Sequence, residues 1–225
     1  MAPSGTPDGC LSLVEEPMEY RQTLSDWSFG LRWLVACALG LFFGGMLAFA
    51  SVWTLGEIVE RAAGETAAYL TVGALFGSII GLGASIGPGL ILQNRGIPAS
   101  RWIVASVVAG AIGMATGFAF VFTYLDPETM PQALTAAVIG LSLGLPLGLG
   151  QWLALRRYSL LAGEWVLVSS LAFVVGLLVG LPLGGEGREW LSLGIIGLLV
   201  GAITGLGMVW SLRRQTLSPR AGTAS

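Results

Sequence analysis

The chain has 225 residues, of which 54% are hydrophobic and only 11% are charged. Because a soluble domain carries roughly 25% charged residues, this composition excludes a soluble globular protein and indicates an integral membrane protein. The formal net charge of −2 does not favour nucleic acid as a partner.

The first 29 residues are polar and acidic, and they contain Pro3, Pro7 and Pro17. We expect residues 1–29 to form a largely flexible cytoplasmic tail, with a short surface helix over Glu15–Phe29 as the alternative. The segment lacks the basic start and apolar core of a cleavable signal, so the first apolar run is expected to direct insertion.

Six apolar runs follow, and none carries a charged residue in its middle. Each is long enough to cross a hydrocarbon core of about 30 Å as a helix, whereas barrel strands would alternate polar and apolar residues. We therefore predict an all-α membrane protein with a six-helix transmembrane domain over residues 30–214 and a cytoplasmic tail over 215–225. The runs are Gly30–Trp53, Ala67–Leu92, Trp102–Leu125, Ala133–Leu155, Trp165–Gly184 and Trp190–Leu212, with kinks expected near Pro88 and Pro146.

Most of the arginines fall on one side of the expected membrane. The nine on the side of both termini are Arg21, Arg32, Arg95, Arg101, Arg156, Arg157, Arg213, Arg214 and Arg220, against Arg61 and Arg188 opposite. The positive-inside rule predicts a multi-pass protein of the inner (cytoplasmic) membrane with both termini in the cytoplasm. The opposite loops are acidic, which favours a solvated surface over the alternative of a cation site; they carry Glu57, Glu60, Glu65, Asp126, Glu128, Glu186 and Glu189.

A ten-residue motif occurs in two similar copies, GLGQWLALRR from Gly148 and GLGMVWSLRR from Gly205. A tryptophan one turn before an arginine pair is typical of a helix leaving the bilayer. We predict membrane-interface anchors at Trp33, Trp102, Trp152, Trp165, Trp210, Arg156, Arg157, Arg213 and Arg214. A phosphate or nucleotide site at the first arginine pair is the alternative.

The motif belongs to a longer internal repeat. A 63-residue shift places Trp102 on Trp165, and a 69-residue shift places Trp33 on Trp102. We predict three tandem helical hairpins over residues 30–92, 101–155 and 164–212, related by a pseudo-threefold axis along the membrane normal.

Small residues recur at four-residue spacing in every apolar run, which places them on one helix face. Glycine lets backbones approach closely in lipid, where apolar burial alone gains little. We predict helix packing at Gly44, Gly77, Gly81, Gly113, Gly117, Gly140, Gly144, Gly148, Gly176, Gly180, Gly197, Gly201 and Gly205. Glycines that line a pore, or leave room for a flat lipid or pigment, are the alternative.

The sequence offers no catalytic, cofactor-binding or metal-binding residues. Histidine is absent, which removes the usual haem and zinc ligand and the usual general base. Cys10 lies in the tail and Cys37 in the first helix, so neither a disulfide nor a metal pair is expected. We therefore expect a protein that is not an enzyme and has no cofactor.

The stretch Gln151–Arg157, the following Trp165 and the run Gly197–Arg214 resemble uncharacterised bacterial glycine-rich six-helix membrane proteins with a Gln-Trp-Leu-x-Leu-Arg-Arg helix end. The resemblance covers the second half of the chain directly and the first half through the repeat. It implies the fold and no activity.

From these features we expect an accessory or packing protein whose partners are membrane lipids and other membrane proteins. The alternative is a channel or carrier for a small uncharged solute along the pseudo-threefold axis. A polar passage would have to use the hydroxyls of Ser78, Ser106, Thr116, Ser142, Ser169 and Thr204.

Overall fold

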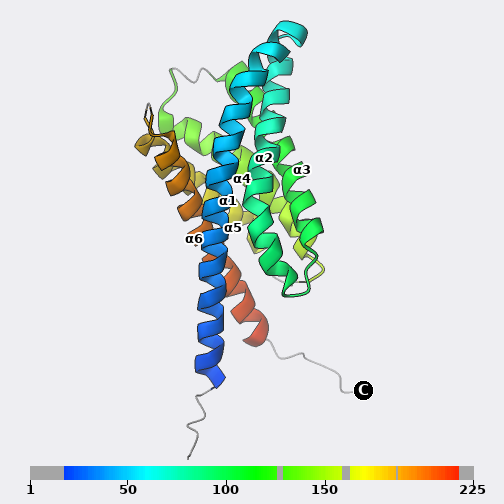
Figure 1. The fold of residues 1–225 in the computed structure, drawn as a ribbon, viewed down its shortest axis with the longest axis vertical. Helices are drawn as coiled ribbons and strands as arrows, with labels where there is room; N and C mark the ends of the chain where they lie inside the picture. The colour runs from blue at the N-terminus through cyan, green and yellow to red at the C-terminus, as the bar shows by residue number, and fades with distance from the viewer. Residues whose placement is uncertain (1–17, 126–128, 159–162, 186, 218–225) are drawn as a thin grey trace, which may run out of the picture.

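The computed structural model describes residues 18–125, 129–158, 163–185 and 187–217. These residues form six α-helices (Figure 1). The helices are α1 (Met18–Ala63), α2 (Glu65–Gln93), α3 (Ala99–Tyr124), α4 (Gln132–Leu155), α5 (Glu164–Leu183) and α6 (Glu189–Leu217). Most of the two expected tails lies outside the described residues, namely residues 1–17 and 218–225. The same holds for the acidic loop residues Asp126, Glu128 and Glu186.

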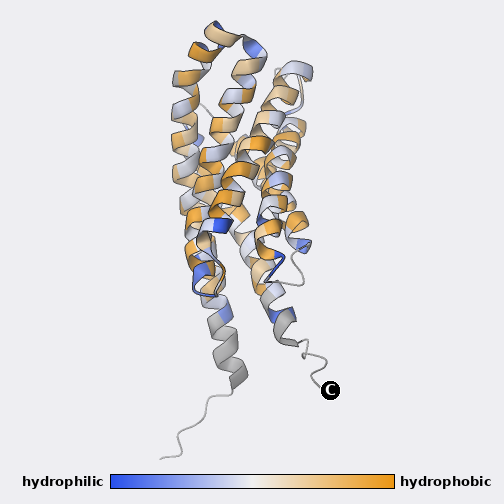
Figure 2. Cartoon of the chain, turned by 90° about the vertical axis from the view of Figure 1, so that its right-hand side faces the viewer, coloured by the Kyte–Doolittle hydropathy of each residue, from blue (hydrophilic) through white to orange (hydrophobic). Residues whose placement is uncertain are grey.

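All six helices are long and apolar enough to cross a membrane. Figure 2 shows apolar residues along the length of the bundle and polar ones gathered towards its two ends. Each of the six predicted runs corresponds to one of the six helices. The bounds agree to within three residues for α2 to α5, whereas α1 extends beyond its run at both ends and α6 continues past Leu212 to Leu217. The chain is therefore a multi-pass, all-helical membrane protein.

The helices are arranged as a ring. Each helix packs against its neighbours in sequence, and α1 packs against α6 to close the circle. The start of α1 and the end of α6 lie at the same end of the bundle (Figure 1). Because α2 also ends there and α3 begins there, most arginines gather at this end, which we call the arginine-rich end.

The first helix differs from the prediction, because α1 starts at Met18 and not at Gly30. The expectation that residues 18–29 belong to a flexible tail is wrong. No glycine or proline interrupts Met18–Phe29, so nothing in this segment breaks a helix. At its other end α1 runs past Trp53 to Ala63, where Gly64 adopts a φ of 85° that favours glycine and turns the chain into α2.

Glycines lie where the helices touch. At each of the thirteen glycines of the predicted packing set, an added Cβ would come within 3.3 Å or less of an atom of a neighbouring helix. The closest approaches are backbone against backbone, at Gly40 with Gly83 between α1 and α2 and at Gly77 with Gly110 between α2 and α3. Any side chain at these positions would separate the two helices.

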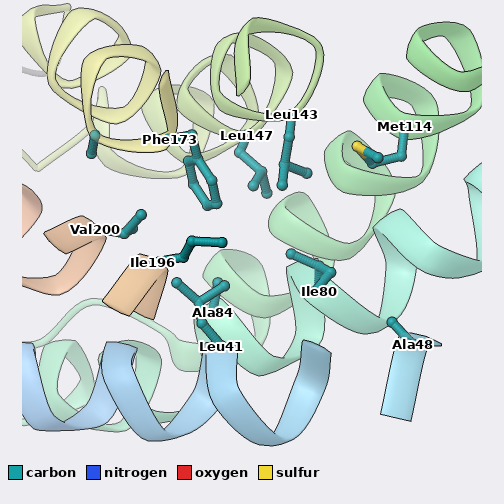
Figure 3. Close-up of a cluster of buried hydrophobic side chains, with 11 residues drawn as sticks. Leu41, Ala48, Ile80, Ala84, Met114, Leu143, Leu147, Phe173, Ile196 and Val200 are labelled. Carbon is teal, nitrogen blue, oxygen red and sulfur yellow. The ribbon is translucent and has the colours of Figure 1, made fainter. Parts of the chain in front are cut away.

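Two clusters of buried side chains lie inside the ring. The cluster near the middle draws residues from all six helices, and Figure 3 shows their side chains converging, among them Leu41, Ile80, Met114, Leu143, Phe173 and Ile196. The second cluster lies nearer the arginine-rich end and includes Trp33, Trp102 and Trp165. The ring therefore has a packed axis over this part of its length.

We predict that Gly144→Leu destabilises the bundle by about 1 to 3 kcal/mol, the usual effect of overpacking. A Cβ at Gly144 would lie 2.9 Å from the Cα of Ser170 in α5, so the leucine side chain has no room. Thermal unfolding in detergent measures the loss.

The matched control is Leu141→Ala on the same helix, since the Leu141 side chain is 50% exposed. Its unfolding temperature should stay close to that of the unmodified protein. Equal losses for the two variants would contradict the packing account.

Candidate functional site

Three tryptophans meet inside the ring near the arginine-rich end. The ring centroids of Trp33 and Trp102 are 6.0 Å apart, those of Trp33 and Trp165 are 5.8 Å apart, and those of Trp102 and Trp165 are 5.8 Å apart. Their planes are tilted or perpendicular, an arrangement that aromatic pairs favour. The mutual contacts put the three rings at one level, where they fill the axis.

This placement corrects the prediction that these three side chains are membrane-interface anchors. Trp33 and Trp102 are each 1% exposed and Trp165 is 5% exposed, so none of them faces lipid headgroups. The reason is the rotation of each helix about its own axis, which places the tryptophans of α1, α3 and α5 on the face that points into the ring.

The anchors predicted at the ends of α4 and α6 are more exposed. Trp210 is exposed and the guanidinium of Arg214 lies 3.6 Å from its ring centroid, while Trp152 is half-buried. Arg156 and Arg157 are exposed, and Arg213 pairs with Asp26 at 3.2 Å. These positions are compatible with an interfacial role, which stays a prediction.

A buried hydrogen-bond network holds the second and third tryptophans. Gln151 Oε1 accepts a hydrogen bond from Trp165 Nε1 at 2.7 Å, and Gln151 Nε2 donates to Ser106 Oγ at 3.0 Å. The Ser106 hydroxyl in turn donates to the carbonyl of Trp102 at 2.9 Å. One glutamine on α4 thus joins α3 to α5.

The first tryptophan has its own partner on α6. Trp33 Nε1 donates to Thr204 Oγ1 at 3.1 Å, and that hydroxyl donates to the carbonyl of Val200 at 2.6 Å. Trp102 Nε1, by contrast, is buried and has no partner among the described residues. The 63-residue shift pairs Gln151 with Pro88 on α2, whose side chain has no acceptor to offer.

The half of the bundle that lies away from the arginine-rich end contains a cavity of about 540 Å³ between the six helices. Its inner end is made by the central cluster, including Ile80, Leu143 and Ile196, and its lining reaches Gly184 and Glu189, where α5 joins α6. The volume falls within the roughly 300 to 1,000 Å³ typical of ligand pockets. We call this cavity the central pocket.

The walls of the central pocket are apolar, and its two sides differ. Along α1, α2 and α3 runs a chain of aromatic contacts, from Phe49 to Phe76 at 5.3 Å, on to Phe118 at 5.6 Å and to Phe122 at 5.6 Å. Facing them are mostly aliphatic residues of α4, α5 and α6, such as Ile139, Leu177 and Leu193. The pocket therefore suits a hydrocarbon ligand.

Only Glu189 and Ser192 among the described lining residues carry polar side chains, and both lie where α6 begins, beside Gly184 and Gly185. Glu189 Oε1 accepts a hydrogen bond from the backbone N–H of Gly187 at 3.2 Å. A headgroup held at this mouth would meet a carboxylate and a hydroxyl, and a negative charge would be disfavoured.

The hydroxyls considered for a polar passage do not line the central pocket. Ser78 and Thr116 donate to carbonyls of their own helices at 2.7 Å and 2.9 Å. Ser106 and Thr204 lie at the tryptophan level in the bonds described above. Within the described residues, no three His, Cys, Asp or Glu side chains gather in a way that could hold a metal ion.

We predict that Trp165→Phe lowers stability more than Trp102→Phe, by about 1 to 2 kcal/mol. Both changes remove similar volume from one cluster, but only the first leaves Gln151 Oε1 buried without its donor, whereas Trp102 Nε1 has no partner to lose. Thermal unfolding of the two variants in the same detergent compares them. A larger loss for Trp102→Phe would contradict the assigned hydrogen bonds.

A comparison of the chain with protein-family models, with curated protein sequences and with solved structures found no match.

Proposed function

We propose that this protein is a non-enzymatic accessory protein of the membrane that holds the hydrocarbon chain of a lipid in its central pocket. The observation that carries the proposal is the apolar cavity of about 540 Å³ between the six helices. Lipid molecules and other membrane proteins are its partners.

The chemistry of the walls supports a hydrocarbon occupant. Water inside the pocket would find hydrogen-bond partners only near Glu189 and Ser192 at the mouth, and apolar cavities do not hold water well. Each methylene that leaves water for such a site gains about 0.8 kcal/mol. An acyl chain that enters from the bilayer gains much less, because the lipid tails it leaves are equally apolar. The selectivity for one lipid over another then depends on the shape of the pocket and on the polar groups at its mouth.

The same features favour a pocket over a solute passage. A channel or carrier along the axis needs a route past the level of Trp33, Trp102 and Trp165, whose rings are in mutual contact. It would also need polar walls, and the described walls of the pocket are aromatic and aliphatic. Lipid binding requires neither.

The proposal includes the three-hairpin arrangement and the orientation. The meeting of Trp33, Trp102 and Trp165 supports a pseudo-threefold relation between the hairpins that begin with α1, α3 and α5. With the arginine-rich end in the cytoplasm of an inner membrane, the pocket opens towards the outer leaflet.

Photolabelling tests the proposal. The protein is reconstituted in phosphatidylcholine vesicles that carry a photoactivatable group near the end of one acyl chain, and adducts are mapped by peptide mass spectrometry. We expect adducts on pocket residues such as Phe76 and Ile139, in addition to lipid-facing ones.

Leu177→Trp should remove most of the pocket adducts, because Leu177 lines the pocket and the larger ring occupies it. The matched control is Leu171→Trp on the same helix, where the side chain is 58% exposed and outside the pocket. Pocket adducts that are absent from the unmodified protein, or that persist unchanged in Leu177→Trp, would refute the proposal.

A further inference from the structure

We propose that the protein binds two anionic phospholipids at its arginine-rich end, one at the seam between α1 and α2 and one at the seam between α3 and α4. Each lipid phosphate lies between arginines contributed by both helices. These sites are separate from the central pocket and do not depend on the function proposed for it.

Both seams are hollowed at the arginine-rich end. The first holds a cavity of about 280 Å³ lined by Arg32 of α1 together with Asn94 and Arg95, which follow α2. The second holds a cavity of about 630 Å³ lined by Arg101 of α3 and by Arg156 and Arg157, which follow α4. Each cavity thus joins the start of one helix to the end of its hairpin partner.

Within the part of the chain that the structure describes, the charges in these two seams are uncompensated. No described carboxylate pairs with Arg32 or Arg95 in the first seam, or with the three arginines of the second. The Arg95 guanidinium is held 5.0 Å from the centroid of the buried Phe29 ring. Like charges gathered at the edge of a low-dielectric bundle raise the local potential and attract an anion.

In the third seam, between α5 and α6, the positive charge at the corresponding position is neutralised by a carboxylate of the protein itself. The 63-residue shift that pairs the repeats places Arg101 on Glu164, and a 57-residue shift places Arg157 on Arg214. Arg214 Nη1 and Glu164 Oε1 form an ion pair at 3.4 Å. A carboxylate built into the chain thus occupies, in the third hairpin, the role that an external anion fills in the first two.

The helix surface between the arginines and the middle of the bundle is apolar, which favours a phospholipid over free phosphate as the ligand. The cavity of the second seam continues along Val104, Val108 and Leu153, whose side chains are 61%, 52% and 51% exposed. Leu90 lies in the same place in the first seam and is 56% exposed. An acyl chain can follow this apolar groove while guanidinium groups hold the phosphate through paired hydrogen bonds.

Native mass spectrometry of the protein released from vesicles tests the inference. In vesicles of phosphatidylglycerol and phosphatidylcholine, we expect two tightly held phosphatidylglycerol molecules per protein. Arg101→Glu, which copies the third seam, should retain one, and Arg32→Glu with Arg101→Glu should retain none; the affinity at each altered seam should fall about tenfold or more. The third hairpin already accommodates glutamate at this position, so the fold should persist.

Two further variants sharpen the experiment. Glu164→Arg removes the carboxylate that pairs with Arg214 and gives the third seam an arginine from each helix, as in the second seam. It should add a third phosphatidylglycerol, a gain that mere damage to the protein would not produce. Arg61→Gln is the control, because Arg61 lies at the opposite end, exposed and paired with Glu57.

Equal retention of phosphatidylcholine and phosphatidylglycerol would overturn the inference, as would two retained molecules in the double variant. Displacement of phosphatidylglycerol by millimolar inorganic phosphate would assign the seams to free phosphate instead. Photolabelling of the central pocket by phosphatidylcholine is read independently, so either proposal can fail alone.

Discussion

The close approach of helix backbones at glycine is the constraint on which the rest of this structure depends. Inside a bilayer, neighbouring helices gain little from hiding apolar side chains, so van der Waals contact and a few hydrogen bonds must hold them together. Contacts such as Gly77 with Gly110 and Gly144 with Ser170 bring successive helices close enough to supply that contact. With α1 packed against α6, the seams close into a ring whose interior must be filled by side chains or by a ligand.

The interior is occupied differently at the two ends of the bundle. Towards the arginine-rich end, three tryptophans and their hydrogen bonds to Gln151 and Thr204 occupy the axis. Towards the other end the inward side chains stand apart, with phenylalanines on one side and mostly aliphatic residues on the other, and they leave the central pocket. A closed end and an open end on one axis suit a protein that holds a lipid chain better than one that passes a solute.

Much of this architecture could be predicted from the sequence, because charge-free apolar runs and four-residue glycine spacing are direct consequences of the lipid environment. The orientation of Trp33, Trp102 and Trp165 was missed because a tryptophan beside an arginine at a helix end has the same composition whether its ring faces lipid or the axis. A signal was present: Ser106 and Ser169 each follow a tryptophan by one turn, which places both residues on one helix face. The central pocket could not be predicted, since it arises where Phe49, Phe76 and Phe118 meet across three helices and no single helix contains its pattern.

The most direct test of this account is an experimental structure of the protein in a lipid nanodisc, at a resolution that shows side chains. We expect the rings of Trp33, Trp102 and Trp165 in mutual contact on the axis, and continuous, unbranched density that enters beside Glu189 and ends above Leu143. A water-filled passage through the tryptophan level would contradict the account. So would a central pocket closed by the collapse of its own walls.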